Sequence, residues 1–189
     1  METKNSLFSS ALKSGLIIGI VSIVVFIIMY VADIKPVGIM MPFVIMLIGL
    51  AINITVLVVL FKKHRTEAGG FISFGNAFLY CFIALAVASV ISTIFTLLFV
   101  QFIEPDYYKS IIDAQKTYME NYLSGKVSEE QMAQTMDKMD EQAAKMGSVK
   151  STLIGLLTSV IVSGIIALIA GAVMKKNPDI FDNTAGGVI

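Results

Sequence analysis

Residues 104–150 read EPDYYKSIIDAQKTYMENYLSGKVSEEQMAQTMDKMDEQAAKMGSVK, and this is the only long segment that a lipid bilayer would exclude. Its charges are spread along its whole length, and charged side chains are costly in hydrocarbon. The sequence on either side consists mainly of long uncharged runs. The segment therefore predicts a polar element that is carried between membrane-crossing helices.

The composition of the whole chain is that of a membrane protein. Hydrophobic residues make up 56% of the 189 residues, charged residues 15%, and the mean hydropathy is +0.82. These values lie outside the range of ordinary soluble domains. The single cysteine, Cys81, stands in an apolar run, so an intrachain disulfide is excluded and no paired thiols suggest a metal or redox site.

Four uncharged runs are each long enough to cross a bilayer, which takes roughly 20 helical residues. We predict an all-α membrane protein with spans at about 14–32, 38–61, 77–103 and 151–174, an extracytoplasmic two-helix hairpin at 104–150, and a cytoplasmic tail at 175–189. Within this tail we expect residues 177–189 to be disordered. A cleaved signal peptide is a less favoured explanation of the first run, because the apolar core of such a peptide spans only roughly 7 to 15 residues.

Local signals divide the polar segment into two helices. Pro105 suits the first turn of a helix, and Ser124-Gly125 is a stop signal. The pattern Ser128-Glu129-Glu130-Gln131 is a capping box that opens a second helix, and Gly147 closes it. Two helices with a short connection and matching apolar stripes predict a helical hairpin.

The stripes of this hairpin contain the residues that we regard as a candidate partner surface. They are aromatic or methionine side chains at helical spacing: Tyr107, Tyr108, Tyr118, Tyr122, Met132, Met136 and Met139. Methionine thioethers can bind copper(I), but methionine at heptad spacing more often packs between helices, and no Cys or His accompanies these residues. We therefore predict no metal and no cofactor.

Small or polar residues at helical spacing mark the faces on which the spans pack. Small residues at intervals of four let helix backbones approach closely, and a lone Asn in hydrocarbon most often hydrogen-bonds a neighbouring helix. The predicted helix-packing residues are Gly15, Gly19, Asn53, Ala88, Ser92, Gly155, Ser159, Ser163, Ala167 and Gly171.

Basic residues at the ends of the spans predict the topology. The cluster Lys62-Lys63-His64-Arg65 directly follows the second span, and positive residues in such positions are retained in the cytoplasm. Lys175 and Lys176 then fall on the same side, as does Lys13. We expect a bacterial inner-membrane protein with both termini in the cytoplasm, and we expect His64 to be exposed to solvent.

The order of these features resembles a known bacterial family of four-span membrane proteins, domain of unknown function 4199. The resemblance rests on GFISFGNAF at residues 70–78, on IEPDY at residues 103–107, and on the arrangement of spans, basic loop and polar hairpin over nearly the whole length. It implies an integral inner-membrane protein and no particular activity.

The residues favour a structural or accessory role over catalysis. The chain offers one His, one Cys and acids scattered along helix faces, so we predict no enzyme and no catalytic residues. We expect the lipid bilayer as a partner, together with a homo-oligomer or another membrane protein, and no nucleic acid, because the one basic patch is short. The alternative is a small-solute channel or transporter subunit formed by oligomers and lined by hydroxyls such as Ser92, Thr93, Thr96, Ser159 and Ser163.

Overall fold

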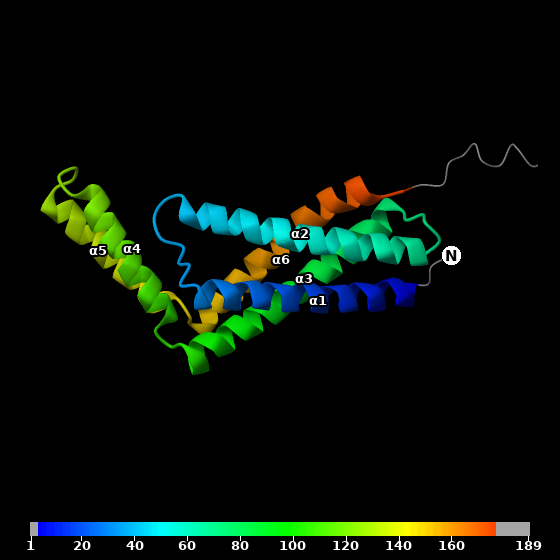
Figure 1. The fold of residues 1–189 in the computed structure, drawn as a ribbon, viewed down its shortest axis with the longest axis horizontal. Coiled ribbons are helices and arrows are strands. Elements are labelled where there is room, and N and C mark those ends of the chain that lie inside the picture. The colour runs from blue at the N-terminus through cyan, green and yellow to red at the C-terminus, as the bar shows by residue number, and fades with distance from the viewer. Residues whose placement is uncertain (1–3, 177–189) are drawn as a thin grey trace, which may run out of the picture.

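The described chain is helical throughout and forms a bundle of long helices with a shorter hairpin at one end (Figure 1). The structure is a computed structural model and describes residues 4–176. Its α-helices are α1 (Lys4–Val31), α2 (Met41–Glu67), α3 (Phe74–Leu98), α4 (Tyr107–Leu123), α5 (Glu129–Lys145) and α6 (Val149–Met174). A π-helical turn, η1 (Phe99–Ile103), extends α3.

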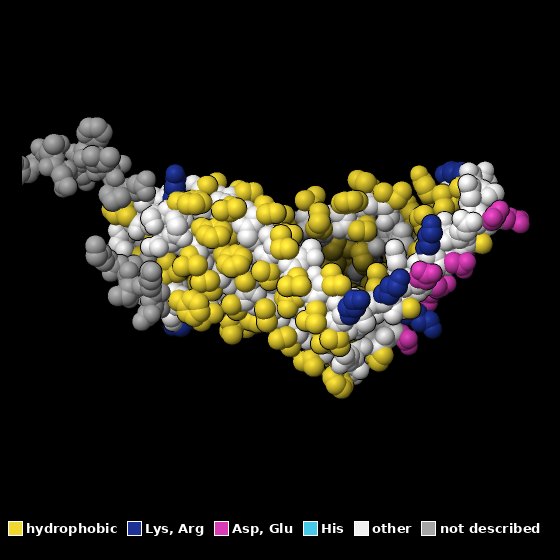
Figure 2. Space-filling model, turned by 180° about the vertical axis from the view of Figure 1, so that it is seen from behind, with side chains coloured by type: hydrophobic (Ala, Val, Ile, Leu, Met, Phe, Trp, Pro, Cys, Tyr) yellow, Lys and Arg dark blue, Asp and Glu magenta, His cyan; other side chains and the backbone are white. Residues whose placement is uncertain are grey.

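Four of these helical segments are long and apolar enough to cross a membrane. They are Ser6–Val31, Met41–Glu67, Phe74–Ile103 and Val149–Met174, where the third joins α3 to η1. In the space-filling view hydrophobic side chains cover the length of the spans, and the acidic side chains seen on that face gather on the hairpin (Figure 2). The predicted all-α membrane protein with four spans and a polar two-helix element is therefore confirmed at the level of the fold.

The spans pack around α3, which contacts α1 along one side and α6 along another. More of the fully buried side chains lie on α3 than on any other helix, among them Tyr80, Cys81 and Ala84. The α2 helix packs chiefly on α1 and reaches α3 near its own last turns, where Leu57 and Phe61 are completely buried. Most apolar side chains of α2 and α6 face outward, as expected for helices that face lipid.

The bounds of the spans differ from the sequence predictions at three places. The α1 helix begins ten residues before the predicted start at Ser14, because no Gly or Pro interrupts residues 4–14. The α2 helix begins three residues later than predicted, after Gly38 with φ +88°, and continues through the basic cluster to Glu67. The α3 helix begins at Phe74, where the Ser73 hydroxyl caps it by accepting a hydrogen bond from the backbone N–H of Asn76.

The hairpin α4–α5 follows the local signals of its sequence. Ser128 forms a complete capping box with Gln131 at the start of α5, as predicted. Gly125 and Gly147 take φ of +72° and +75° after the ends of α4 and α5, a conformation that glycine adopts without strain. Beyond the spans the hairpin extends away from the bundle, inclined to it (Figure 1).

The end of the bundle opposite the hairpin is tied together by backbone contacts. Ile72, in the loop before α3, and Lys176, after α6, exchange two backbone hydrogen bonds of 3.0 Å. The Arg65 guanidinium of α2 donates to the carbonyl oxygen of Met174 at 3.1 Å, at the C-terminal end of α6. The remainder of the predicted tail, residues 177–189, lies outside the described residues.

Candidate functional site

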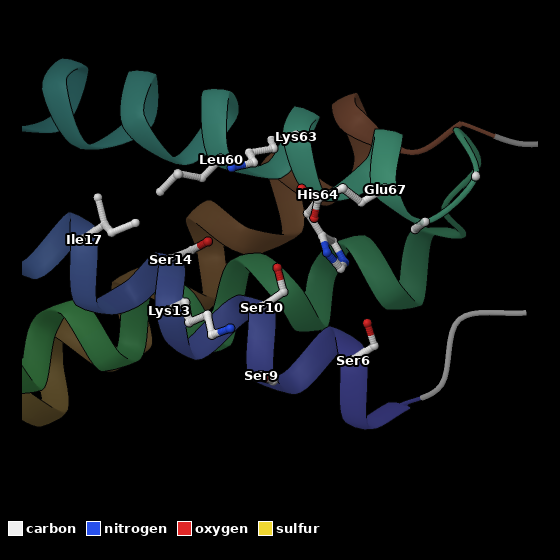
Figure 3. A pocket seen from close by; sticks show the side chains of 12 residues that line it. Ser6, Ser9, Ser10, Lys13, Ser14, Ile17, Leu60, Lys63, His64 and Glu67 are labelled. Atoms are coloured by element: carbon white, nitrogen blue, oxygen red, sulfur yellow. The ribbon is translucent and has the colours of Figure 1, made fainter.

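A cleft of about 870 Å³ opens between α1 and α2 at the end of the bundle opposite the hairpin (Figure 3). One wall is a row of hydroxyls and one ammonium from the first turns of α1, and the other comes from the last turns of α2. The polar side chains that line it are Ser6, Ser9, Ser10, Lys13, Ser14, Lys63, His64 and Glu67. Its volume is larger than that of the groove of about 380 Å³ between α3 and α6 that is described below.

The α1 wall results from the helical repeat. Ser6, Ser10 and Ser14 follow one another at intervals of four, and Lys13 follows Ser10 by three, which places them on one side of a helix. This face was not predicted from the sequence, because the first span was expected to begin only at Ser14. The repeat of serines was the signal that could have revealed it.

The floor of the cleft is a contact between three helices. The Ser14 hydroxyl lies 2.6 Å from the Tyr80 hydroxyl, and both side chains are buried. The His64 ring stacks on the Tyr80 ring, with centroids 4.6 Å apart and an interplanar angle of 17°. Through the contact of the two hydroxyls and the stack of the two rings, the floor joins α1, α2 and α3 inside the span region.

The expectation that His64 is exposed to solvent is wrong, because only 4% of its surface is accessible. The residue follows Leu57 and Phe61 at intervals of four and three, so it continues the buried face of α2. Its charged neighbours Lys62, Lys63 and Arg65 suggested exposure, whereas its position on the helix determines burial.

The cations of the basic cluster divide into different environments. Lys62 and Lys63 are exposed, and only Lys63 lines the cleft. Arg65 is half-buried and caps α6, whereas Lys175 and Lys176 are exposed beside the end of α6. The predicted topology residues therefore all lie at the same end of the bundle.

Asn53 joins α2 to α1 deeper in the span region. Its side-chain carbonyl accepts a hydrogen bond of 2.9 Å from the Ser22 hydroxyl, and its amide donates to the carbonyl oxygen of Gly49 at 3.0 Å. These groups adjoin a mostly apolar cavity of about 250 Å³. The geometry at Asn53 is that of a polar link between helices.

The predicted packing residues lie mostly where helix backbones approach α3. A Cβ atom at Gly15 would stand 2.7 Å from the Ala84 carbonyl oxygen, and one at Gly171 would stand 2.9 Å from the Phe78 nitrogen. Gly19 is similarly close to Ile91, at 3.0 Å. Other members of the predicted set are buried in the bundle: Ala88, Ser163 and Ala167.

Gly155 was predicted to pack, but the structure places it on an open surface. No atom lies within 4 Å of the position that its Cβ would occupy, because α3 and α6 separate toward the hairpin. The separation leaves a groove of about 380 Å³, lined by Gly155, Ser92, Thr93 and Thr96 among others. Glycine spacing alone does not show where two crossing helices part.

Ser159 and Ser163, predicted as packing residues and as possible pore hydroxyls, form hydrogen bonds within their own helix. The Ser159 hydroxyl donates to the Leu156 carbonyl and the Ser163 hydroxyl to the Ser159 carbonyl, each at 2.8 Å. Both bonds lie within α6. Serine can satisfy its hydroxyl on its own helix backbone, which makes a partner helix unnecessary.

The base of the hairpin is fixed to the spans by the tyrosines of the predicted partner surface. Tyr107 packs its ring on Phe26 and Phe99, with centroids 5.5 and 5.7 Å away. Tyr118 lies against Gly38, whose backbone N–H donates to the Gln115 side chain at 2.6 Å. Burial raises the pKa of the phenols of Tyr107 and Tyr108 above the ordinary value.

The methionines of α5 form part of the seam with α4. Met132, Met136 and Met139 are half-buried, and the two helices are also joined by an ion pair between Lys116 and Asp140. In contrast, Tyr122 is 45% exposed and stacks on Tyr118 with centroids 5.9 Å apart. Of the predicted partner surface, Tyr122 is thus the side chain most open to solvent.

Titratable side chains do not gather into a metal centre in the part of the chain that the structure describes. No group of three or more His, Cys, Asp or Glu residues there is arranged to hold an ion. Cys81 is fully buried within α3.

Four apolar helices, a polar hairpin and a polar cleft define a multi-pass membrane protein. The chain belongs to the family described as protein of unknown function (DUF4199), whose profile matches residues 13–176. Comparison with curated proteins gives no match, and comparison with solved structures gives none either. Membership of this family agrees with the resemblance seen in the sequence. Because the function of the family is unknown, the activity has to be argued from the site.

Proposed function

We propose that the chain is a non-enzymatic, accessory protein of the bacterial cytoplasmic membrane. Both termini lie in the cytoplasm, and the hairpin α4–α5 is held outside the cell membrane as an element that contacts a protein partner. The observation that carries this proposal is the clamp at the base of the hairpin, which fixes its direction relative to the spans.

The clamp joins α4, and Glu104 just before it, to α1 and to the loop between α1 and α2. The Tyr30 hydroxyl donates to the Glu104 carboxylate at 2.7 Å, and Gln115 accepts from the Gly38 backbone at 2.6 Å. The Tyr107 ring adds contacts to Phe26. A hairpin attached only through its two chain connections would not require this set of contacts. The contacts fix the direction of the hairpin, which supports a role in presenting its tip to a partner.

The distribution of positive charge supports the proposed orientation. Lys62, Lys63, Arg65, Lys175 and Lys176 all lie at the bundle end opposite the hairpin. Clustered Lys and Arg next to span ends remain on the cytoplasmic side. The hairpin then lies outside, and its lysines are spread among its acids rather than clustered at a span end.

The orientation can be tested by labelling introduced cysteines in intact cells. Replacing the buried Cys81 by Ser removes the one native thiol, after which Glu130→Cys and Lys62→Cys provide one exposed reporter on each side. A membrane-impermeant maleimide should label position 130 in intact cells and position 62 only after lysis. Labelling of position 62 but not of position 130 in intact cells would show the opposite topology and refute the proposal.

The role of the hairpin can be tested by photocrosslinking from its exposed tip. A photoreactive residue at Tyr122, which is 45% exposed, should give a protein adduct in intact cells. The matched control at Tyr108, which faces Gly147 at the base, should give only intramolecular adducts. Lipid or intramolecular adducts alone at position 122 would count against a protein partner.

The groove between α3 and α6 favours a second candidate function, a small-solute channel formed by oligomers. Its hydroxyls Ser92, Thr93 and Thr96 face an opening of about 380 Å³, and pores can be lined by hydroxyls and backbone carbonyls. A second copy would have to close the open side. Solute flux in proteoliposomes that is lost in Thr96→Val would support this function, and no flux at any protein density would remove it.

A further inference from the structure

We infer that the cleft between α1 and α2 binds a phosphate ester that carries a net negative charge, such as the headgroup of an anionic phospholipid. The inference is independent of the proposed role of the hairpin, because it concerns the opposite end of the molecule. It rests on the charges of the cleft, on its hydroxyls, and on the order of polar and apolar residues along its walls.

Two ammonium groups stand on opposite walls of the cleft. Lys13 comes from α1 and Lys63 from α2, and the close-up shows the two walls facing each other (Figure 3). Within residues 4–176 the structure shows no ion pair for either lysine. Lysine binds phosphate as a compact point charge, so an anion between the walls would satisfy both groups.

The serines supply the uncharged donors that phosphate oxygens require. Ser6, Ser9 and Ser10 line the same cleft as the two lysines. Each hydroxyl can donate one hydrogen bond, and the two non-bridging oxygens of a phosphate diester can accept several. Among the described residues that line the cleft, two lysines and one carboxylate, Glu67, give a formal charge of +1, which matches a monoanionic diester.

The cleft is apolar one helical turn deeper on both walls. Ile17 follows Ser14 on α1, Leu60 precedes Lys63 on α2, and both line the cavity. A phospholipid has the same order, with a phosphate at the membrane surface and acyl chains below it. A binding site for a soluble anion alone would not need the apolar pair.

The floor keeps the two walls at a fixed separation. The stack of His64 on Tyr80 and the contact of Ser14 with the Tyr80 hydroxyl anchor α2 and α1 to α3 beneath the lysines. Basic pockets between transmembrane helices on the cytoplasmic side are a recurrent form of lipid headgroup site. The structure therefore presents a preformed pocket of this kind rather than two dispersed surface cations.

The test measures lipid binding to the full chain purified in a neutral detergent. Native mass spectrometry follows a titration with phosphatidylglycerol and, separately, with phosphatidylcholine. The test variant carries Lys13→Gln and Lys63→Gln. The control variant carries Lys62→Gln and Lys175→Gln, which removes the same charge from the same end of the bundle but outside the cleft.

The tightest phosphatidylglycerol site should weaken at least about 10-fold in the test variant and less than about 2-fold in the control. Arginine at positions 13 and 63 should restore binding. Three results would overturn the inference: equal weakening in the test variant and the control variant, no weakening in the test variant, or an affinity of the wild type for phosphatidylcholine equal to that for phosphatidylglycerol. Both lysines are exposed, so the variant should fold, and its thermal unfolding is recorded in parallel.

A second variant and a soluble competitor complete the test. Ser6→Ala with Ser9→Ala alters two exposed hydroxyls and should weaken phosphatidylglycerol binding by about 2- to 5-fold, and unchanged binding would contradict the role of the serines. Competition by millimolar glycerol phosphate identifies a site that accepts the free ester. Lipid binding that resists this competitor assigns the site to the membrane lipid.

Discussion

Replacing Gly171 by alanine should destabilise the bundle, because α6 approaches the backbone of α3 at this residue. The added Cβ would lie 2.9 Å from the Phe78 nitrogen and 3.0 Å from its Cα. Carbon atoms in contact prefer about 3.5 to 4.0 Å, so the helices would have to separate by about 0.5 Å. Overpacking of this kind costs about 1 to 3 kcal/mol, and the better helix propensity of alanine offsets up to about 1 kcal/mol of it.

Values from the middle of these two ranges give an expected net loss of about 1 to 2 kcal/mol in the free energy of unfolding. The same helix offers two matched controls. Alanine at Gly164 would lie 3.8 Å from the Phe82 ring, an ordinary contact, and alanine at Gly155 would meet no atom within 4 Å. Both controls should be neutral or slightly stabilising, since they gain helix propensity without a clash.

Thermal unfolding followed by circular dichroism in a single detergent measures the three variants together. At about 2 to 4 °C per kcal/mol, Gly171→Ala should melt about 2 to 8 °C below the wild type. Gly155→Ala and Gly164→Ala should melt at or above it. If Gly171→Ala melted with the wild type while Gly155→Ala melted lower, the packing of α6 on α3 described above would be refuted.

Three further perturbations test other contacts. Asn53→Leu should lower the free energy of unfolding by about 0.6 kcal/mol, because it removes the hydrogen bond from Ser22. Adding Ser22→Ala to this variant should lower it little further in the same unfolding assay, and fully additive effects of the two changes would argue against the link. Gln115→Ala should cost about 1 kcal/mol at the clamp and speed hydrogen exchange of the Gly38 amide, whereas unchanged exchange would contradict the bond. Because burial raises the pKa of Tyr107, its stabilising effect is complete below about pH 10 and is lost as pH rises through the raised pKa. The wild type should therefore lose melting temperature more steeply than Tyr107→Phe above about pH 10, and parallel curves would show that this phenol does not contribute.

The elements of this fold could be predicted from the sequence because their signals are local. Long uncharged runs mark the spans, and the Ser128 capping box and Gly147 mark the ends of α5. Small residues such as Gly15 also indicate that some backbone lies close by. These features depend on the bilayer and on a few neighbouring residues, which a single sequence contains.

The candidate site could not be predicted in the same way, because it depends on how two helices are placed and rotated. His64 is surrounded in sequence by charges but shares a helix face with the buried Phe61. Ser6 and Ser10 precede the predicted span, and only the extension of α1 brings them opposite Lys63. Tertiary placement, which sequence spacing does not specify, creates the cleft.

The last turns of α2 are held by two adjacent residues that point to different helices. His64 stacks on α3 and Arg65 bonds to the end of α6, and neighbouring helical residues point about 100° apart. One turn of α2 therefore cannot twist about its axis without breaking one of these attachments. At its other end α2 follows Gly38, whose backbone N–H is bonded to Gln115 of α4, and Asn53 links the middle of the helix to Ser22 of α1, so α2 is attached to a different neighbour at each stage of its length.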